Sequence, residues 1–403
     1  MRLNSGHLQK LEALVATGMP GAYKVLIFFL IQYIYDLGTL GTIASWQSIA
    51  QIVGFFTAIG WSSLVLVRVA KAETKKDRVE VFNSLSIMGF STLLVCASGI
   101  LIIGVLLNMI EEGIQIIYWA TAWTFYQIPR HYLIALRVYR KAIAMDVAVI
   151  GLSICTILMV SAEAASVWLA FSMMAAGLTA FILIQRGSNA DRPNLGYEFK
   201  GLEFGLANFL SGGVSLSLIP LAAIFESEAF VGIFSLFIST MGIALLIPRA
   251  ISLNQLPKLA KIVDLPETLT THIALMRRQI SLSNILTSTV CLAIGTIIIL
   301  RLPETLSFTS VSLTFLLIIL QNTLSTQGLI DANILTCREK SRHLLKINIV
   351  TSTFFFIITM ILIWKPINHA FTYICLTTTI LSIYRLNKTR HYANSINDSH
   401  AAL

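Results

Sequence analysis

Long apolar stretches alternate along this chain with short breaks of charged and turn-forming residues. Each stretch has about 20 residues, which is the length that an apolar helix needs to cross the hydrocarbon core of a bilayer. The stretches are too long and too continuous for the roughly 10-residue alternating strands of a membrane β-barrel. Because lipid gives the backbone no hydrogen-bond partner, each stretch is expected to be helical. Twelve membrane spans are predicted, at residues 11–35, 42–67, 82–107, 114–136, 142–160, 165–185, 202–224, 229–248, 279–300, 308–330, 347–364 and 367–384.

The first apolar stretch and the turn after it recur in the second half of the chain. Residues 11–41 align without a gap to residues 202–232 at an offset of 191, with six identical positions. Both copies would run from the inside to the outside of the membrane. The pattern predicts an all-α polytopic protein with two parallel six-helix halves, residues 1–190 and 191–403, related by a pseudo-two-fold axis along the membrane normal. A chance match between two apolar segments stays open as the alternative.

The composition excludes most other classes of protein. Of the 403 residues, 56% are hydrophobic and only 12% are charged, against about 25% charged in a soluble domain. These charges are too few to cover a soluble surface, which excludes a soluble enzyme, a secreted module and a nucleic-acid-binding domain. The five cysteines are irregularly spaced and predict neither a disulfide framework nor a metal site.

The lysines and arginines predict the orientation of the chain. If the N-terminus is cytoplasmic, 25 of the 29 Lys and Arg residues fall on the inner side, and only Arg301 and Lys365 fall in outer loops. This asymmetry follows the positive-inside rule and predicts that both termini are cytoplasmic. The longest inner segment, about 249–278, is expected to form an amphipathic helix on the inner membrane surface. Its apolar positions are Leu253, Leu256, Leu259, Ile262 and Val263.

Lys24 is the sharpest candidate for a functional residue. It lies about 20 Å into the first span at 1.5 Å per residue, near the membrane midplane, where a lysine costs about 2.5–3.5 kcal/mol. Pro20 and Gly21 precede it by one turn and favour a kinked or opened helix. One interpretation is a cation that faces a wet cavity and holds an anion. An internal ion pair, or a misplaced end of the span, is the structural alternative.

Small and polar residues share the face of the first span on which Lys24 lies. Thr17, Gly21 and Lys24 follow the spacing i, i+4, i+7, which is one side of a helix. Both first helices would then turn a polar stripe toward the axis between the halves, and polar contacts that hold helices together are the alternative. The aligned residues in the second copy are Asn208, Gly212 and Ser215.

The fourth span carries aromatic residues beside a second cation. Trp119, Trp123, Tyr126 and Arg130 lie on one helical face. Aromatic rings next to a cation suit stacking on sugar rings and contact with a phosphate. Alternatively, Trp119 belongs to the outer interfacial belt and Arg130 reaches the inner interface.

Two carboxylates lie near the inner ends of spans. Asp146 and Asp331 are expected to pair with nearby basic residues, and ion coupling is the weaker alternative. The sequence has no glycine-rich phosphate loop, nucleophile elbow or His/Cys metal spacing. We therefore expect no catalytic residue, no metal site and no cofactor, and a protein that is not an enzyme.

Two segments carry a resemblance to a known family. Residues 35–80 read YDLGTLGTIASWQSIAQIVGFFTAIGWSSLVLVRVAKAETKKDRVE, with an LG-containing turn, a span that ends in VRVA, and a basic loop interleaved with acidic residues. The counterpart in the second half begins FESEAFVGIF and ends in a proline-containing segment. The chain resembles the Wzx-type polysaccharide or O-antigen flippases of the MOP (multidrug/oligosaccharidyl-lipid/polysaccharide) exporter superfamily.

The resemblance implies a function in the bacterial inner membrane. A flippase of this type moves an undecaprenyl-pyrophosphate-linked oligosaccharide from the inner to the outer leaflet by alternating access, in the biosynthesis of lipopolysaccharide or another surface polysaccharide. The implied partners are the lipid-linked oligosaccharide, membrane lipid, a polysaccharide polymerase, a chain-length regulator and a coupling ion, H⁺ or Na⁺, with no nucleic acid. A MATE-like drug antiporter of the same superfamily is the first alternative, and a membrane glycosyltransferase or polymerase is the second.

Overall fold

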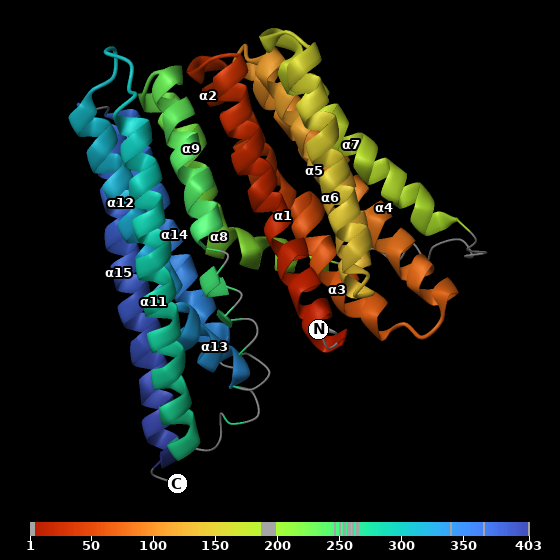
Figure 1. Cartoon of the computed structure of the whole chain (residues 1–403), viewed down its shortest axis with the longest axis vertical. Coiled ribbons are helices and arrows are strands. Elements are labelled where there is room, and N and C mark those ends of the chain that lie inside the picture. Colours follow the sequence, from red (N-terminus) through yellow and green to blue (C-terminus); the bar gives the residue numbers. More distant parts are fainter. Residues whose placement is uncertain are drawn as a thin grey trace. The chain divides into compact units, whose positions relative to one another are not determined.

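A computed structural model describes residues 5–186, 199–245, 247–249, 251–252, 255, 259, 262, 266–338, 341–365 and 367–401. Within these ranges the regular elements are all helical, with no strand (Figure 1). They are α1 (Ser5–Ile34), α2 (Leu37–Gly54), the π-helix η1 (Phe55–Ile59), α3 (Gly60–Lys71), α4 (Lys75–Leu106), α5 (Ile110–Ala135), α6 (Tyr139–Met159), α7 (Ala162–Gln185), α8 (Lys200–Phe225), α9 (Glu228–Ala244), α11 (Pro266–Ile299), α12 (Phe308–Gln327), α13 (Leu329–Cys337), α14 (Ser341–Trp364) and α15 (Ala370–Ala401).

These helices confirm the predicted spans. In the described part of the chain, ten helical stretches are long and apolar enough to cross a membrane. The other two predicted spans, residues 114–136 and 367–384, coincide with α5 and the first half of α15. The prediction of an all-α polytopic membrane protein is therefore correct, because the apolar runs alone locate the helices.

The second span contains a local irregularity. The stretch Leu37–Lys71 is continuous, but η1 interrupts its α-helical ladder with a turn of π-helix. Thr57 in this turn exchanges a 2.9 Å hydrogen bond with Thr124 of α5, and both side chains are buried. Such π-turns occur often near functional sites, and this one packs against α4, α5 and α8.

The described chain divides into two compact units, Met1–Gly232 and Ile233–Leu403. In unit 1, α5 packs on α7, α1 packs on α6, and α2 packs on both α5 and α8. Its core contains large, fully buried side chains, among them Phe28, Trp61, Phe82 and Trp119. The division of the membrane domain into six-helix halves at residue 190 stays a prediction.

Local structure at the repeat supports the internal duplication. The helix break at Ile34 and Leu37 recurs at Phe225 and Glu228, at the same offset of 191. Both breaks carry a side-chain cap: the Asp36 carboxylate accepts a 2.7 Å bond from the Thr39 backbone N–H, and the aligned Ser227 hydroxyl accepts a 3.4 Å bond from Phe230. The bond from the Thr39 N–H lowers the pKa of Asp36.

Two aligned glycines permit a close helix crossing inside unit 1. A Cβ atom added at Gly41 would press against the carbonyl oxygen of Glu228, and one added at Gly232 would press against the carbonyl oxygen of Leu37. Leu37 and Glu228 are themselves aligned by the repeat. The two contacts are therefore reciprocal, as a two-fold relation between the starts of α2 and α9 requires.

Unit 2 contains a separate small core at one end. Its members come from α11, α13, α15 and residue 259, and they are Leu259, Leu269, Ile273, Met276, Ile280, Ile330, Ile334, Leu335 and Ala393. The expectation of a surface helix over 249–278 is wrong for residues 266–278, which form the start of α11. Leu259 is fully buried in this small core, so it packs against protein and not on a membrane surface. Leu253, Leu256 and Val263 lie outside the described residues.

Candidate functional site

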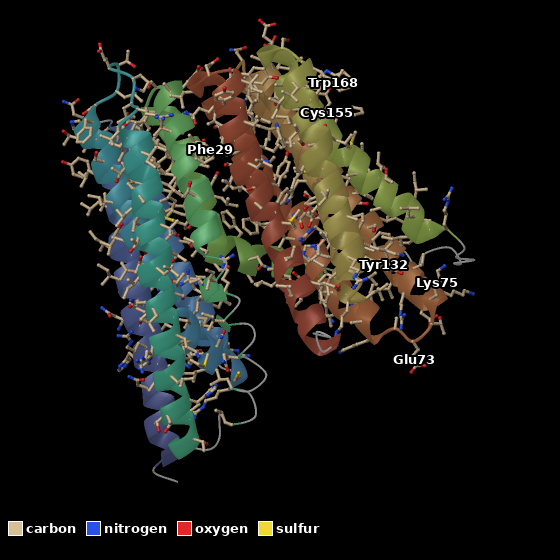
Figure 2. All side chains as sticks on the ribbon, in the orientation of Figure 1. Phe29, Glu73, Lys75, Tyr132, Cys155 and Trp168 are labelled. Carbon is tan, nitrogen blue, oxygen red and sulfur yellow. The ribbon has the colours of Figure 1, made fainter. Side chains whose placement is uncertain are left out.

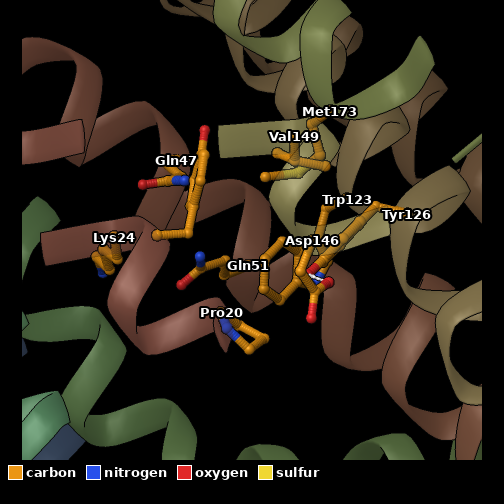
Figure 3. A pocket seen from close by; sticks show the side chains of 10 residues that line it. Pro20, Lys24, Gln47, Gln51, Trp123, Tyr126, Asp146, Val149 and Met173 are labelled. Carbon is orange, nitrogen blue, oxygen red and sulfur yellow. Dashed lines mark hydrogen bonds between the residues drawn. The ribbon is translucent and has the colours of Figure 1, made fainter. Parts of the chain in front are cut away.

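A cavity lies within unit 1 among α1, α2, α5, α6 and α7. Its volume is about 20 Å³, which is room for about one water molecule. Figure 3 shows side chains from α1 and α2 facing others from α5, α6 and α7. The lining residues are Pro20, Tyr23, Lys24, Gln47, Gln51, Trp123, Tyr126, Asp146, Val149 and Met173.

Lys24 contributes a positive charge to this cavity from the middle of α1. Its ammonium nitrogen lies 5.3 Å from the centroid of the Phe28 ring. Within the described ranges it has no hydrogen bond or ion pair, so the alternative of an internal ion pair finds no partner there. A cation–π contact offsets only part of the cost of burying an ammonium group. The charge is therefore available to an anion.

Polar groups without partners accompany this charge. Gln47 is only 2% exposed, and its side-chain oxygen accepts no hydrogen bond from the described residues. The indole N–H of Trp123 is also buried and without an acceptor among them. An unsatisfied buried polar group costs about 1–3 kcal/mol, so a ligand or water that satisfies these groups is favoured to bind.

Arg130 forms a buried ion pair with Asp146. Its Nε lies 3.0 Å from Oδ1 of Asp146, and its guanidinium also donates to the carbonyl oxygen of Ala16 in α1. The Tyr126 hydroxyl donates a 2.6 Å hydrogen bond to the same Asp146 oxygen. These contacts join α1, α5 and α6, and they neutralise the carboxylate that lines the cavity.

The cavity therefore collects only some of the residues that the sequence singled out. Lys24, Trp123 and Tyr126 line it, whereas Arg130 lies behind Asp146. Arg130, which the sequence suggested as a cavity residue, is not among the residues that line this cavity and pairs with Asp146 instead. The expected pairing of Asp146 is present.

Three other residues of the predicted polar stripe lie outside this cavity. Thr17 and Ser215 are exposed, and Thr17 donates to the Ala13 carbonyl oxygen of its own helix. Asn208 is half-buried and donates to the Phe204 carbonyl oxygen. None of the three lines the cavity described above. Their orientation toward an axis between the two halves stays a prediction.

Sequence reasoning missed the glutamines of the second span. Gln47 and Gln51 are four residues apart and therefore share one helical face. Two amides at this spacing inside an apolar span were a usable signal. Trp119 does not belong to an interfacial belt, which was the alternative interpretation of this residue. It is buried, and its indole N–H donates a 3.0 Å hydrogen bond to the Ser166 hydroxyl.

Comparison with known proteins gives a match by structure only. No protein-family model matches the chain, and no curated protein matches its sequence. An inward-facing multidrug resistance MATE family transporter of the MOP superfamily aligns over 97% of this chain and 99% of its own, with a TM-score of 0.66 and 13% identity. The chain has the fold of MATE transporters.

Two further solved structures have the same fold. The MATE multidrug transporter DinF-BH in complex with R6G covers 96% of both chains at a TM-score of 0.50 and 14% identity. A MOP superfamily transporter from Pyrococcus furiosus Vc1, described by a reverse polarity of its binding pocket, covers 97% of this chain and 95% of its own at a TM-score of 0.54 and 11% identity. At such identities the MATE fold is the shared property, and its twelve helices in two halves agree with the predicted architecture.

Proposed function

We propose that this chain is a transporter that works by alternating access and moves an undecaprenyl-pyrophosphate-linked oligosaccharide from the inner to the outer leaflet of a bacterial inner membrane. The observation that carries the proposal is the charge of the cavity in unit 1. Lys24 has no anionic partner among the described residues, whereas Asp146 is neutralised by Arg130. The cavity therefore favours an anion over a cation.

The chemistry of a pyrophosphate suits this arrangement. Its oxygens accept strong charge-assisted hydrogen bonds from an ammonium group, and such bonds are stronger in a water-poor site. The indole N–H of Trp123 is a second donor, and Gln47 and Gln51 offer amides to sugar hydroxyls. The polyprenyl tail would stay in lipid.

The size of the cavity requires a conformational change during transport. A volume of about 20 Å³ admits one oxygen-sized group and excludes a sugar ring. Pro20 lies on the cavity wall inside α1 and interrupts the helical hydrogen-bond ladder there. A bend of α1 at Pro20 would widen the site and move Lys24 with it. The further partners on this proposal are a coupling ion, a polymerase and a chain-length regulator.

A small-molecule antiporter is the second candidate. The similarity to multidrug MATE structures favours it. In this case Asp146 would have to leave Arg130 and bind a cationic compound in its place.

Export of surface glycan in a strain that lacks the native gene tests the proposal. We expect Lys24→Ala to lower export by about tenfold or more, because a charge-assisted hydrogen bond is lost, and Lys24→Arg to retain part of it. Lys365→Ala is the matched control, since this exposed lysine lies in a predicted outer loop. The membrane level of each variant is measured in parallel.

Two results would contradict the flippase. One is full glycan export by Lys24→Ala at normal expression. The other is unchanged export in all variants together with altered resistance to cationic dyes, which would favour the antiporter.

A further inference from the structure

A second group of charges lies at the end of unit 2 where its small core is found. Asp331 of α13 is fully buried between two arginines. Its Oδ1 lies 2.6 Å from a terminal guanidinium nitrogen of Arg277 in α11, and its Oδ2 lies 3.7 Å from Nε of Arg390 in α15. Three helices that are distant in sequence thus contribute to one cluster.

The three residues are at similar helical distances from the predicted outer ends of their helices. At 1.5 Å per residue, Arg277 is about 33 Å from the end of α11 at Ile299. By the same measure Asp331 is about 35 Å from the start of α12, and Arg390 about 30 Å from the start of α15. The hydrocarbon core is about 30 Å thick, so the cluster lies at the level of the lipid headgroups. The charge distribution predicts that this is the cytoplasmic side.

The cluster has an excess of positive charge on two partly exposed side chains. One carboxylate faces two guanidinium groups. The Nε atoms of Arg277 and Arg390 are buried against the cluster and have no hydrogen-bond acceptor among the described residues, so a ligand would contact the exposed parts of the two side chains instead. The side chains are 39% and 42% exposed, respectively, so both can reach a ligand. The exposed Arg278 and Lys388 are near in sequence and add to the local positive charge.

The arginines are held in place before any ligand binds. Ile330 flanks Asp331 in sequence and Met276 flanks Arg277, and both belong to the buried core of this end of unit 2. Asp331 itself is inaccessible to solvent, so it acts as an anchor that orients the two guanidinium planes. A planar, pre-oriented guanidinium group binds phosphate through two parallel hydrogen bonds.

We propose that Arg277 and Arg390 form a binding site for the phosphate group of an anionic lipid in the cytoplasmic leaflet. Because the cluster lies at the level of the headgroups, the ligand is expected to be a lipid headgroup. Because two arginines surround one carboxylate, that headgroup is expected to be anionic. The site is independent of the cavity at Lys24 and does not rest on the proposed function, because a flippase and an antiporter could both use it.

Native mass spectrometry of the full-length protein tests this site. The probes are phosphatidylglycerol, the zwitterionic phosphatidylethanolamine, and inorganic phosphate as the soluble alternative. We expect the wild type to retain phosphatidylglycerol selectively, and Arg277→Gln and Arg390→Gln each to weaken its binding by about tenfold. Arg301→Gln, at a predicted outer loop, is the control and should bind normally. Arg277→Lys keeps the positive charge but cannot form two parallel hydrogen bonds to a phosphate, so it should lose part of the affinity.

Each other outcome overturns the assignment. Unchanged phosphatidylglycerol binding in the Arg277→Gln/Arg390→Gln double variant would remove the site. An equal loss of phosphatidylglycerol binding in Arg301→Gln would show that the lipid is held only by general attraction between charges. Retention of inorganic phosphate with the same dependence on Arg277, and no preference among lipids, would assign the site to a soluble phosphate instead. Because Arg277→Lys preserves the ion pair with Asp331, full affinity in a correctly folded Arg277→Lys protein would contradict bidentate recognition.

Discussion

Lys24 and Arg130 both lie within membrane-spanning helices of unit 1, but their surroundings differ. Arg130 meets Asp146 and the Ala16 carbonyl oxygen, which together satisfy its charge and several of its donors. Lys24 lies over the ring of Phe28 and lines a small cavity. A buried cation that is paired with a carboxylate contributes to structure, whereas the half-buried Lys24, which has no carboxylate partner among the described residues, is available for a ligand.

The Arg130–Asp146 pair gives a prediction about stability. Arg130→Gln or Asp146→Asn alone should lower the free energy of unfolding by about 3–5 kcal/mol, because each leaves one buried charge unpaired. The double variant should lose less than the sum of the two. Denaturation in detergent micelles measures this in a double-mutant cycle.

The exposed pair of Arg140 and Glu12 is the control for this measurement. Its atoms are 2.7 Å apart, but the Arg140 side chain is 74% exposed, so Arg140→Gln should change stability by at most about 1 kcal/mol. Equal effects of Arg130→Gln and Arg140→Gln would contradict a structural role for the buried pair.

At the scale of the helices, close crossings and long extensions shape each unit. The reciprocal contacts at Gly41 and Gly232 bring the starts of α2 and α9 together. In unit 2, α11 and α15 have 34 and 32 residues, which is more than a membrane crossing needs. Their extra turns form the small core that holds Asp331 between its arginines.

The glycine crossing predicts opposite effects for two similar substitutions. Gly41→Ala should destabilise the protein by about 1–3 kcal/mol, because the added methyl group meets the Glu228 backbone. Gly99→Ala in α4 meets no atom within 4 Å and should stabilise its helix by about 0.5–1 kcal/mol. Thermal unfolding of the purified variants compares them, and an equal melting temperature for the two would refute the close approach.

At the scale of the whole molecule, the distribution of Lys and Arg residues between the loops is consistent with the arrangement of the helices. Figure 2 shows Glu73 and Lys75 at one end of unit 1 and Cys155 and Trp168 at the other. The loop that carries Lys75 belongs to the predicted inner side, and the loop before Trp168 belongs to the predicted outer side. The basic inner loops and the short outer loops, which carry few Lys or Arg residues, thus correspond to opposite ends of these helices.

Reporter fusions test this orientation. Fusions after Lys75 and Arg342 should give a cytoplasmic signal, and one after Glu304 should give a periplasmic signal, because the positive-inside rule retains basic loops in the cytoplasm. A periplasmic signal at Lys75 or Arg342 would invalidate the orientation and the assignment of the Arg277 cluster to the cytoplasmic leaflet.

The sequence by itself determined the helices, their positions and the repeat. Lipid leaves the backbone no partner outside the helix, so apolar length alone locates each span, and residues 11–41 align with residues 202–232 at an offset of 191. Only the tertiary structure decided which polar side chains meet. Arg130 binds Asp146 and Asp331 binds Arg277 because the rotation and packing of each helix bring them together. The hydrophobic pattern leaves that rotation open, since these helices present apolar residues on several faces and lipid and protein accept them equally.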